Sequence, residues 1–156
     1  MNWRQRFEPL VRPLMQAFWR LSRGTTLGVR GLVLRSDGHV VLVRHTYVGG
    51  WHLPGGGVEK GESVRDALVH ELRDEAGVVV EGEAPVLGVY ANHRRFRGDH
   101  VVVCVVRDWS PCVPDAAGEI DAVDWFDPTD LPEATTPATR ARISEFLGRS
   151  PVTDTW

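Results

Sequence analysis

The chain has 156 residues, 42% of them hydrophobic and 25% charged, and its formal net charge at pH 7 is −3. This profile is typical of a globular protein with one domain and a real core, and nothing in the total charge indicates nucleic-acid binding. Two cysteines, Cys104 and Cys112, exclude a disulfide framework and a cysteine metal cluster, and no apolar run approaches the roughly 18 residues of a transmembrane helix.

Residues 1–23 differ in charge from the rest of the chain. Five arginines and one glutamate give them a net charge of +4, and their apolar residues recur at helical spacing. We therefore predict a basic amphipathic N-terminal extension, in which Pro9 and Pro13 break the helix or delay its start. Packing on its own domain or a homodimer contact is favoured over peripheral membrane contact, which stays open. Because the segment lacks the pattern of a secretory signal, a reducing, cytoplasmic location is expected.

The domain is expected over residues 24–150, with residues 151–156 as a C-terminal tail. Its first elements are two β-branched runs, "TTLGVRGLVL" and "HVVLVRH", on either side of Asp37-Gly38. Because this pair accepts positive φ angles, it predicts a β-hairpin. A glycine-rich loop, "YVGGWHLPGGGVEKGE", follows the second run.

A helix is predicted from residue 63 to residue 76. Its apolar stripe consists of Val64, Ala67, Leu68 and Leu72. Ser63 is a natural N-cap, and Asp66 three residues later resembles a capping box with aspartate in place of glutamate. Gly77 ends the helix, because glycine readily adopts the left-handed conformation found at helix C-termini.

Three further strands and a final helix are predicted after this point. The strands correspond to "PVLGVYAN", "HVVVCVVRDW" and "AVDWFD", and the helix covers residues 137–147. Cys104 lies inside the second of these runs, where a small buried thiol is expected. Strands before and after a central helix, without the strict alternation of a Rossmann fold, predict a mixed α/β sandwich.

Within the predicted central helix, "ELRDE" places three carboxylates in one turn. Glu71, Asp74 and Glu75 share a sector of about 100°, because a helix rotates about 100° per residue. Neighbouring like charges destabilise a helix by roughly 0.2–0.5 kcal/mol per pair, and a bound divalent cation reverses that cost. Clustered carboxylate oxygens favour a hard ion such as Mg²⁺ or Mn²⁺. The alternative is a solvated charged face that Arg65 and Arg73 neutralise.

The segment "GGVEKGESVRDALVHELRDEAGV", residues 56–78, resembles the signature of the Nudix hydrolases. That signature is a glycine, five residues, a glutamate, seven residues and then Arg-Glu-apolar-x-Glu-Glu-x-Gly-apolar. The positions that match are Gly56, Glu62, Glu71, Leu72, Glu75, Gly77 and Val78. Two positions depart, since His70 replaces the arginine and Asp74 replaces the first glutamate of the pair. The resemblance extends over about residues 25–147, because the order of the flanking strands also suits the family.

The resemblance implies a Nudix-type α/β/α sandwich with a mixed central sheet, to which the N-terminal helical extension is added. It also implies a hydrolase that uses Mg²⁺ or Mn²⁺ and cleaves the diphosphate linkage of a nucleoside diphosphate derivative by attack of water on phosphorus. The small-molecule substrate would be a nucleotide, a dinucleotide or a nucleotide sugar. The alternative is a nucleotide-binding or sensing module with weak catalysis, which the departures at His70 and Asp74 motivate.

Roles for individual residues follow from the same resemblance. Glu71 and Glu75 are the expected catalytic residues and metal ligands, and Asp74 and the carbonyl of Gly55 are further candidate ligands. Glu71 alternatively orients or deprotonates the attacking water. Glu119 is a candidate distal ligand or base, and an exposed loop acid is the alternative there. The residues expected to support the site are Gly56, Glu62, His70 and Gly77.

Four residues are candidate substrate contacts: Arg44, Tyr47, Trp51 and Arg95. Arg44 ends a predicted strand near the glycine-rich loop, and Arg95 lies in the arginine-rich loop "NHRRFRGDH", so either cation could bind phosphate. Tyr47 and Trp51 flank the glycines and could stack on a base. The alternatives are a solvated turn for the arginine-rich loop and packing against the sheet for the two aromatic residues.

Overall fold

The computed structural model describes residues 24–116 and 118–156. The predicted N-terminal extension, residues 1–23, lies outside the described residues. Within the described part of the chain, no helix is long and apolar enough to cross a membrane. The elements in chain order are β1 Thr26–Val33, β2 Val40–His45, α2 Val64–Ala76, β3 Val78–Val80, β4 Val86–Ala91, β5 Asp99–Val106, β6 Trp109–Pro111, β7 Ile120–Phe126 and α3 Pro137–Phe146.

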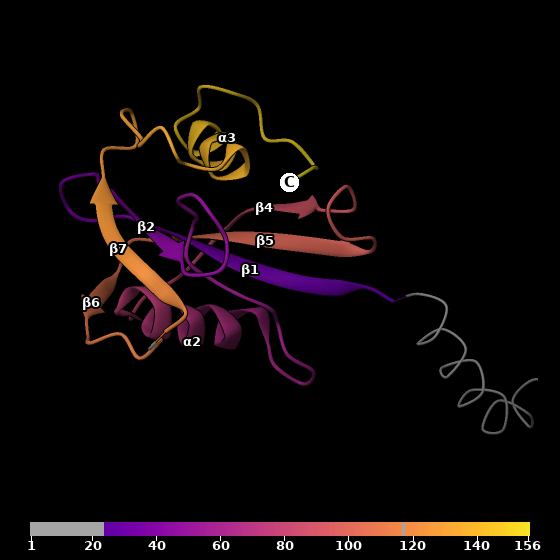
Figure 1. Cartoon of the computed structure of the whole chain (residues 1–156), viewed down its shortest axis with the longest axis horizontal. Helices are drawn as coiled ribbons and strands as arrows, with labels where there is room; N and C mark the ends of the chain where they lie inside the picture. The colour runs from indigo at the N-terminus through magenta and orange to yellow at the C-terminus, as the bar shows by residue number, and fades with distance from the viewer. Residues whose placement is uncertain (1–23, 117) are drawn as a thin grey trace, which may run out of the picture.

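A mixed sheet forms the centre of the fold (Figure 1). Strand β5 lies between β1, with which it pairs in parallel, and β4, with which it pairs antiparallel. Two further antiparallel pairs are formed by β2 with β7 and by β3 with β6. Helix α2 covers one face of the sheet and helix α3 covers the other. The predicted α/β/α arrangement with a mixed sheet is therefore confirmed.

Alternating side chains of the strands build one hydrophobic core beneath each helix. The core beneath α2 contains Val29, Val33, Val41, Ala67, Leu68, Leu72, Val78, Val102, Cys104 and Val106. The core beneath α3 contains Leu32, Leu34, Val40, Leu42, Leu53, Tyr90, Val103, Val105 and Ile143. Successive residues of β1 and β5 point to opposite cores, as the period-two geometry of a strand requires. Cys104 is buried, as expected, and both cysteines are free thiols.

The close packing of α2 on β1 depends on Gly31. A Cβ at this position would lie 2.7 Å from Cδ2 of Leu72, which is fully buried on α2. Because glycine has no side chain, the leucine packs directly against the strand backbone. This contact fixes how closely α2 approaches the sheet, and α2 carries the carboxylates of the site described below.

Helix α2 begins and ends where the sequence predicts. Ser63 Oγ accepts a hydrogen bond from the Asp66 backbone N–H at 3.0 Å and lies 2.6 Å from the Asp66 carboxylate, to which its hydroxyl donates. Gly77 has a φ of 64°, and its N–H donates to the Arg73 carbonyl at 3.2 Å. The two caps fix the ends of α2 and so help to determine which side chains face the sheet.

The turn at Asp37-Gly38 is present, but the hairpin predicted around it is wrong. Gly38 has the expected positive φ of 88°. Only one antiparallel bridge, between Leu34 and Val40, joins the two runs. Beyond it the strands separate, because β1 pairs with β5 and β2 pairs with β7. Asp37-Gly38 thus reverses the chain direction as predicted. Strand β1, however, contributes side chains to both cores and pairs with β5 instead of β2.

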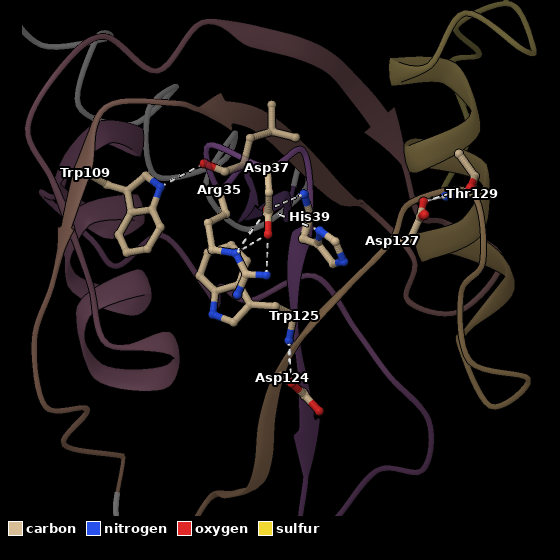
Figure 2. A network of polar contacts seen from close by, with 9 residues as sticks. Arg35, Asp37, His39, Trp109, Asp124, Trp125, Asp127 and Thr129 are labelled. Carbon is tan, nitrogen blue, oxygen red and sulfur yellow. Dashed lines mark hydrogen bonds and ion pairs between the residues drawn. The ribbon is translucent and has the colours of Figure 1, made fainter.

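An aromatic stack connects this turn to the neighbouring strands (Figure 2). The rings of Trp109 on β6 and Trp125 on β7 stack with 5.1 Å between their centroids, and the Arg35 guanidinium lies 5.2 Å from the centroid of Trp125. The Trp109 indole N–H donates to the Leu34 carbonyl at 2.8 Å. Strands β3 and β6, which contain three residues each, were not predicted from the sequence.

Candidate active site

The glycine-rich loop is held along one edge of β1, while β5 occupies the other edge. The Val29 N–H donates to the Gly56 carbonyl and the Gly31 N–H donates to the Pro54 carbonyl, both at 2.9 Å. The loop backbone therefore pairs with β1 in the hydrogen-bonding pattern of an antiparallel strand. The loop backbone is therefore fixed relative to the sheet before any ligand binds.

Glu71 and Glu75 on α2 border this loop. The Gly55 N–H donates to Oε2 of Glu75 at 2.8 Å. A Cβ on Gly56 would lie 2.2 Å from Oε1 of Glu71, so this carboxylate occupies the space that the glycine leaves free. All four residues line one cleft of about 520 Å³. The structure thus brings together two carboxylates and two glycines that the sequence singled out.

Burial raises the pKa of both carboxylates. The pKa of Glu75 rises to about 7 because burial disfavours its charged form, and the Gly55 N–H and Arg30 only partly offset this effect. Burial likewise raises the pKa of Glu71 above its usual range, against the opposing effect of Arg30. One buried and one half-buried acid in the same cleft therefore both have a disfavoured charged form, which a bound cation would stabilise, and such perturbed pKa values are common at functional sites.

Arg30 contributes a partly buried positive charge to the cleft, and no sequence motif predicted it. Its guanidinium donates to the carbonyls of Gly55 and of Leu53, the latter at 3.3 Å. Burial lowers the pKa of Arg30, whereas the neighbouring carboxylates of Glu75 and Glu71 raise it. The side chain keeps its positive charge, because a guanidinium is not deprotonated in proteins. Arg30 thus binds the same Gly55 carbonyl that was expected to bind a metal ion.

His45 and His52 line the cleft together with Tyr47, and neither histidine was predicted. The ring centroid of His45 lies 5.2 Å from that of Tyr47 and 5.4 Å from that of His52. Nδ1 of His45 lies 3.7 Å from Oε1 of Glu75, which is too long for a hydrogen bond. Burial lowers the pKa of His45 and raises that of Glu75, so both shifts oppose a salt bridge between them.

Asp74, predicted as a candidate metal ligand, is not among the residues that line the cleft, and neither are three residues that were expected to support the site: Glu62, His70 and Gly77. The Asp74 carboxylate pairs with Nε2 of His70 at 3.1 Å, and His70 is 70% exposed. Glu62 accepts a hydrogen bond from the Glu59 N–H at 3.0 Å within the loop. Gly77 caps the far end of α2. These contacts shape the helix and the loop, and none of the predicted residues among them lines the cleft.

Glu119, Tyr47 and Arg95 do line the cleft. Glu119 precedes β7, and its backbone is fixed because the Thr46 N–H donates to the Glu119 carbonyl at 2.9 Å. Tyr47 is 70% exposed, and Arg95 lies in the loop between β4 and β5. The cleft therefore combines an acidic side with exposed aromatic and cationic groups.

The other two candidate substrate contacts, Arg44 and Trp51, are not among the residues that line the cleft. Nε of Arg44 pairs with Asp121 at 2.7 Å, and the guanidinium lies 5.2 Å from the centroid of the Trp51 ring. Trp51 also packs edge-on against Phe126, with 4.8 Å between the centroids. Both side chains thus have partners within the β2–β7 region, and for Trp51 this agrees with the alternative of packing against the sheet.

The oxygen donors in the cleft fit a divalent cation that takes only some of its ligands from the protein. Among the described residues, no three His, Cys, Asp or Glu side chains are grouped closely enough to enclose an ion. Glu71, Glu75 and the Gly55 carbonyl nevertheless offer hard oxygen donors in the same cleft. Mg²⁺ is commonly held by one or two carboxylates and completes its shell with water and substrate phosphates. The cleft fits that pattern.

Comparison with known proteins places these features in a family. The sequence profile of the NUDIX domain matches residues 24–147. The MutT-like protein of Streptomyces ambofaciens is 30% identical over 124 residues, which cover 78% of this chain and 77% of that protein. The ADP-ribose pyrophosphatase of Methanocaldococcus jannaschii is 29% identical over 119 residues, which cover 74% of this chain and 69% of that protein.

A solved structure shares the fold. The crystal structure of the MutT NUDIX hydrolase from Burkholderia pseudomallei has a TM-score of 0.67 and 27% identity, and the match covers 78% of this chain and 97% of that one. The fold and the acidic cleft therefore define a hydrolase of phosphoric anhydrides, as predicted. The chain belongs to the Nudix family, whose members act on nucleoside diphosphate derivatives and generally use divalent metal ions.

Proposed function

We propose that this chain hydrolyses the diphosphate linkage of a nucleoside diphosphate derivative in the cytoplasm, with Mg²⁺ or Mn²⁺ bound by Glu71 and Glu75. The observation that carries this proposal is the meeting of the buried Glu75 carboxylate, the half-buried Glu71 carboxylate, the Gly55-Gly56 backbone and Arg30 in one cleft. The similarity to an ADP-ribose pyrophosphatase supports a substrate in which a nucleoside is joined to a phosphoric anhydride. The predicted domain, residues 24–150, is part of the proposal, and the predicted tail, residues 151–156, packs on it, because Asp154 and Trp156 exchange backbone hydrogen bonds with Ala91 on β4.

Arg30 is suited to bind the diphosphate. Its guanidinium is partly buried in the cleft that Glu71 and Glu75 also line, and a guanidinium can donate two parallel hydrogen bonds to a phosphate group. A metal ion and Arg30 compete for the Gly55 carbonyl, to which Arg30 now donates. We therefore propose that Arg30 exchanges this carbonyl for a substrate phosphate oxygen in the loaded enzyme.

The attacking water requires a fixed position and a proton acceptor. Glu71 is our first assignment for orienting this water, through the carboxylate oxygen that does not bind the metal ion, because its carboxylate lies beside Gly56 in the cleft. Glu119 is the second assignment, since its loop is fixed by Thr46 and it lines the same cleft. A bound divalent ion would supply charge neutralisation on the phosphate oxygens, and the protein supplies the positioning.

The proposal is tested on nucleotides, dinucleotides and nucleotide sugars with Mg²⁺ or Mn²⁺. Cleavage yields phosphomonoesters or pyrophosphate, so alkaline phosphatase or inorganic pyrophosphatase is added to convert these products to inorganic phosphate, and this coupled phosphate release is measured. We expect turnover by the native chain and near-total loss of turnover in Glu75→Gln, which keeps an acceptor for the Gly55 N–H but removes the charge. Glu81→Gln is the matched control, because Glu81 is exposed and outside the cleft. Absence of turnover by the native chain with every substrate and either metal would contradict the proposed hydrolase.

A second candidate function is nucleotide binding or sensing with weak catalysis. Two observations favour it: Asp74 pairs with His70 outside the cleft, and Arg30 occupies the Gly55 carbonyl. Calorimetric titration with nucleoside diphosphate derivatives discriminates between the two functions. Binding without phosphate release supports the sensor, whereas binding accompanied by release supports the hydrolase.

A further inference from the structure

The residues that follow α3 return to the sheet and close one side of the cleft. The Ala91 N–H at the end of β4 donates to the Asp154 carbonyl at 2.7 Å, and the Trp156 N–H donates to the Ala91 carbonyl at 3.1 Å. Thr155 thus forms a parallel bridge with Ala91, and the end of the chain lies beside β4 (Figure 1). Trp156 lines the same cleft as the helix carboxylates.

A buried ionic network holds this last segment in place. Arg142 and Glu145 on α3 are 2% and 6% exposed and form an ion pair at 2.8 Å. Arg142 also donates to the Thr155 carbonyl at 2.9 Å, and Glu145 accepts hydrogen bonds from the Thr153 N–H at 3.0 Å and the Tyr90 hydroxyl at 2.9 Å. Because buried charges are costly unless they are well paired, these bonds make the segment an integral part of the fold.

The indole of Trp156 is supported from within the protein. The Arg142 guanidinium lies 5.6 Å from the centroid of the indole ring, and the Tyr90 ring meets it edge-on at 6.0 Å. The side chain nevertheless remains partly exposed where it lines the cleft. A supported aromatic ring on the wall of a cleft offers a stacking surface for a flat aromatic group, and every nucleobase has such a face.

We propose that Trp156 forms the nucleobase subsite, with the base stacked on its indole while the diphosphate reaches Arg30 and the carboxylates of α2. This inference rests on the proposed function, which supplies the class of substrate, a nucleoside diphosphate derivative. Trp51, the other tryptophan considered for stacking, is not among the residues that line the cleft, whereas Trp156 is. Asn92 lines the cleft beside the end of β4. Its side-chain nitrogen donates to the Asp99 carboxylate at 2.8 Å, so its side-chain carbonyl is the group that can accept a hydrogen bond from the edge of a stacked base.

Calorimetric binding of ADP and of inorganic pyrophosphate, each with Mg²⁺, tests the subsite in the full chain. We expect Trp156→Ala and Trp156→Leu to raise the Kd for ADP about tenfold, as loss of base–aromatic stacking predicts, and Trp156→Phe to stay within about twofold. The Kd for pyrophosphate should be unchanged in all three variants. Val152→Ala is the matched control, because Val152 is 52% exposed in the same segment.

The Trp156→Leu variant distinguishes loss of stacking from loss of folding, because leucine keeps an apolar side chain but has no aromatic face. Thermal melting verifies that each variant is folded. Unchanged ADP binding in Trp156→Leu, or equal weakening of ADP and pyrophosphate binding, overturns the subsite. A native chain that binds pyrophosphate but not ADP overturns it as well. Since these readouts need no turnover, missing phosphate release contradicts only the proposed hydrolysis.

Discussion

At the scale of single residues, the carboxylate of Glu71 depends on the space beside Gly56. We predict that Gly56→Ala lowers kcat/KM at least about tenfold, because the new Cβ would lie 2.2 Å from Oε1 of Glu71 and must displace that side chain. The melting temperature should change little, since the displaced atoms are the end of a flexible, half-buried side chain. Steady-state phosphate release and thermal melting together measure both effects.

The neighbouring glycine provides the control for this prediction. Gly57 is exposed, has no positive φ, and a Cβ there would meet nothing within 4 Å. Gly57→Ala should therefore keep both activity and stability. Equal losses of activity in Gly56→Ala and Gly57→Ala would show that loop flexibility, rather than the position of the Glu71 carboxylate, accounts for the effect.

The residues of the cleft differ in how well the sequence predicted them. Glu71, Glu75 and Gly56 were found because a motif of fixed spacing contains all three. Arg30 and Trp156 were missed because they belong to no motif and reach the cleft only through tertiary structure. An arginine inside a β-branched strand was the available signal for Arg30, since a cation in a buried strand needs partners.

At the scale of secondary structure, α2 and β1 set the spacing between the carboxylates and the glycine-rich loop. We predict that Gly31→Ala lowers the free energy of unfolding by about 1–3 kcal/mol, because the new Cβ would overlap the buried Leu72 side chain at 2.7 Å. Helix α2 must then move away from β1, so kcat/KM should fall as well. Urea unfolding and phosphate release measure the two effects.

Gly49→Ala serves as the control for this change, because Gly49 is exposed and a Cβ there would meet nothing within 4 Å. Its stability and activity should match those of the native chain. If Gly31→Ala lost stability but kept full activity, the separation of α2 from β1 would not control the geometry of the site.

Secondary structure was predictable where local signals were complete. Helix α2 carried an N-cap, an apolar stripe and a glycine C-cap, and the structure contains each of them. Strand pairing was not predictable in the same way, because β1 pairs with β5 across a long stretch of sequence rather than with its neighbour β2. Strands β3 and β6 are too short for a period-two pattern to distinguish them from loop.

At the scale of the whole molecule, the cleft is assembled from both faces of the sandwich. Helix α2 supplies Glu71 and Glu75 from one face, and the segment held by α3 supplies Trp156 from the other. The glycine-rich loop and β1 connect the two sides through Gly56 and Arg30. Burial of carboxylates in this cleft costs stability, which couples the function of the site to the pH dependence of folding.

The sign of that coupling follows from Glu75. Its pKa is raised from 4.5 to about 7 in the folded chain, mainly by burial. Between these pH values the folded chain retains a proton that the unfolded chain has released. The contribution of Glu75 to the free energy of unfolding is therefore complete below pH 4.5 and is lost as the pH rises through about 7. The total loss is about 3 kcal/mol. His45 and His52, whose pKa values are lowered by burial, act in the opposite direction.

A comparison with Glu75→Gln isolates this contribution from that of the histidines. In the presence of a metal chelator, we predict that Glu75→Gln and the native chain have similar free energies of unfolding near pH 4.5, and that the variant is more stable by about 3 kcal/mol at pH 8. Urea unfolding at a series of pH values measures this difference. Added Mg²⁺ should stabilise the native chain increasingly as the pH rises, because ion binding requires the deprotonated carboxylate, and should have a smaller effect on the variant. A stability difference that stays constant from pH 4.5 to pH 8 would mean that the Glu75 carboxylate is not destabilised by burial.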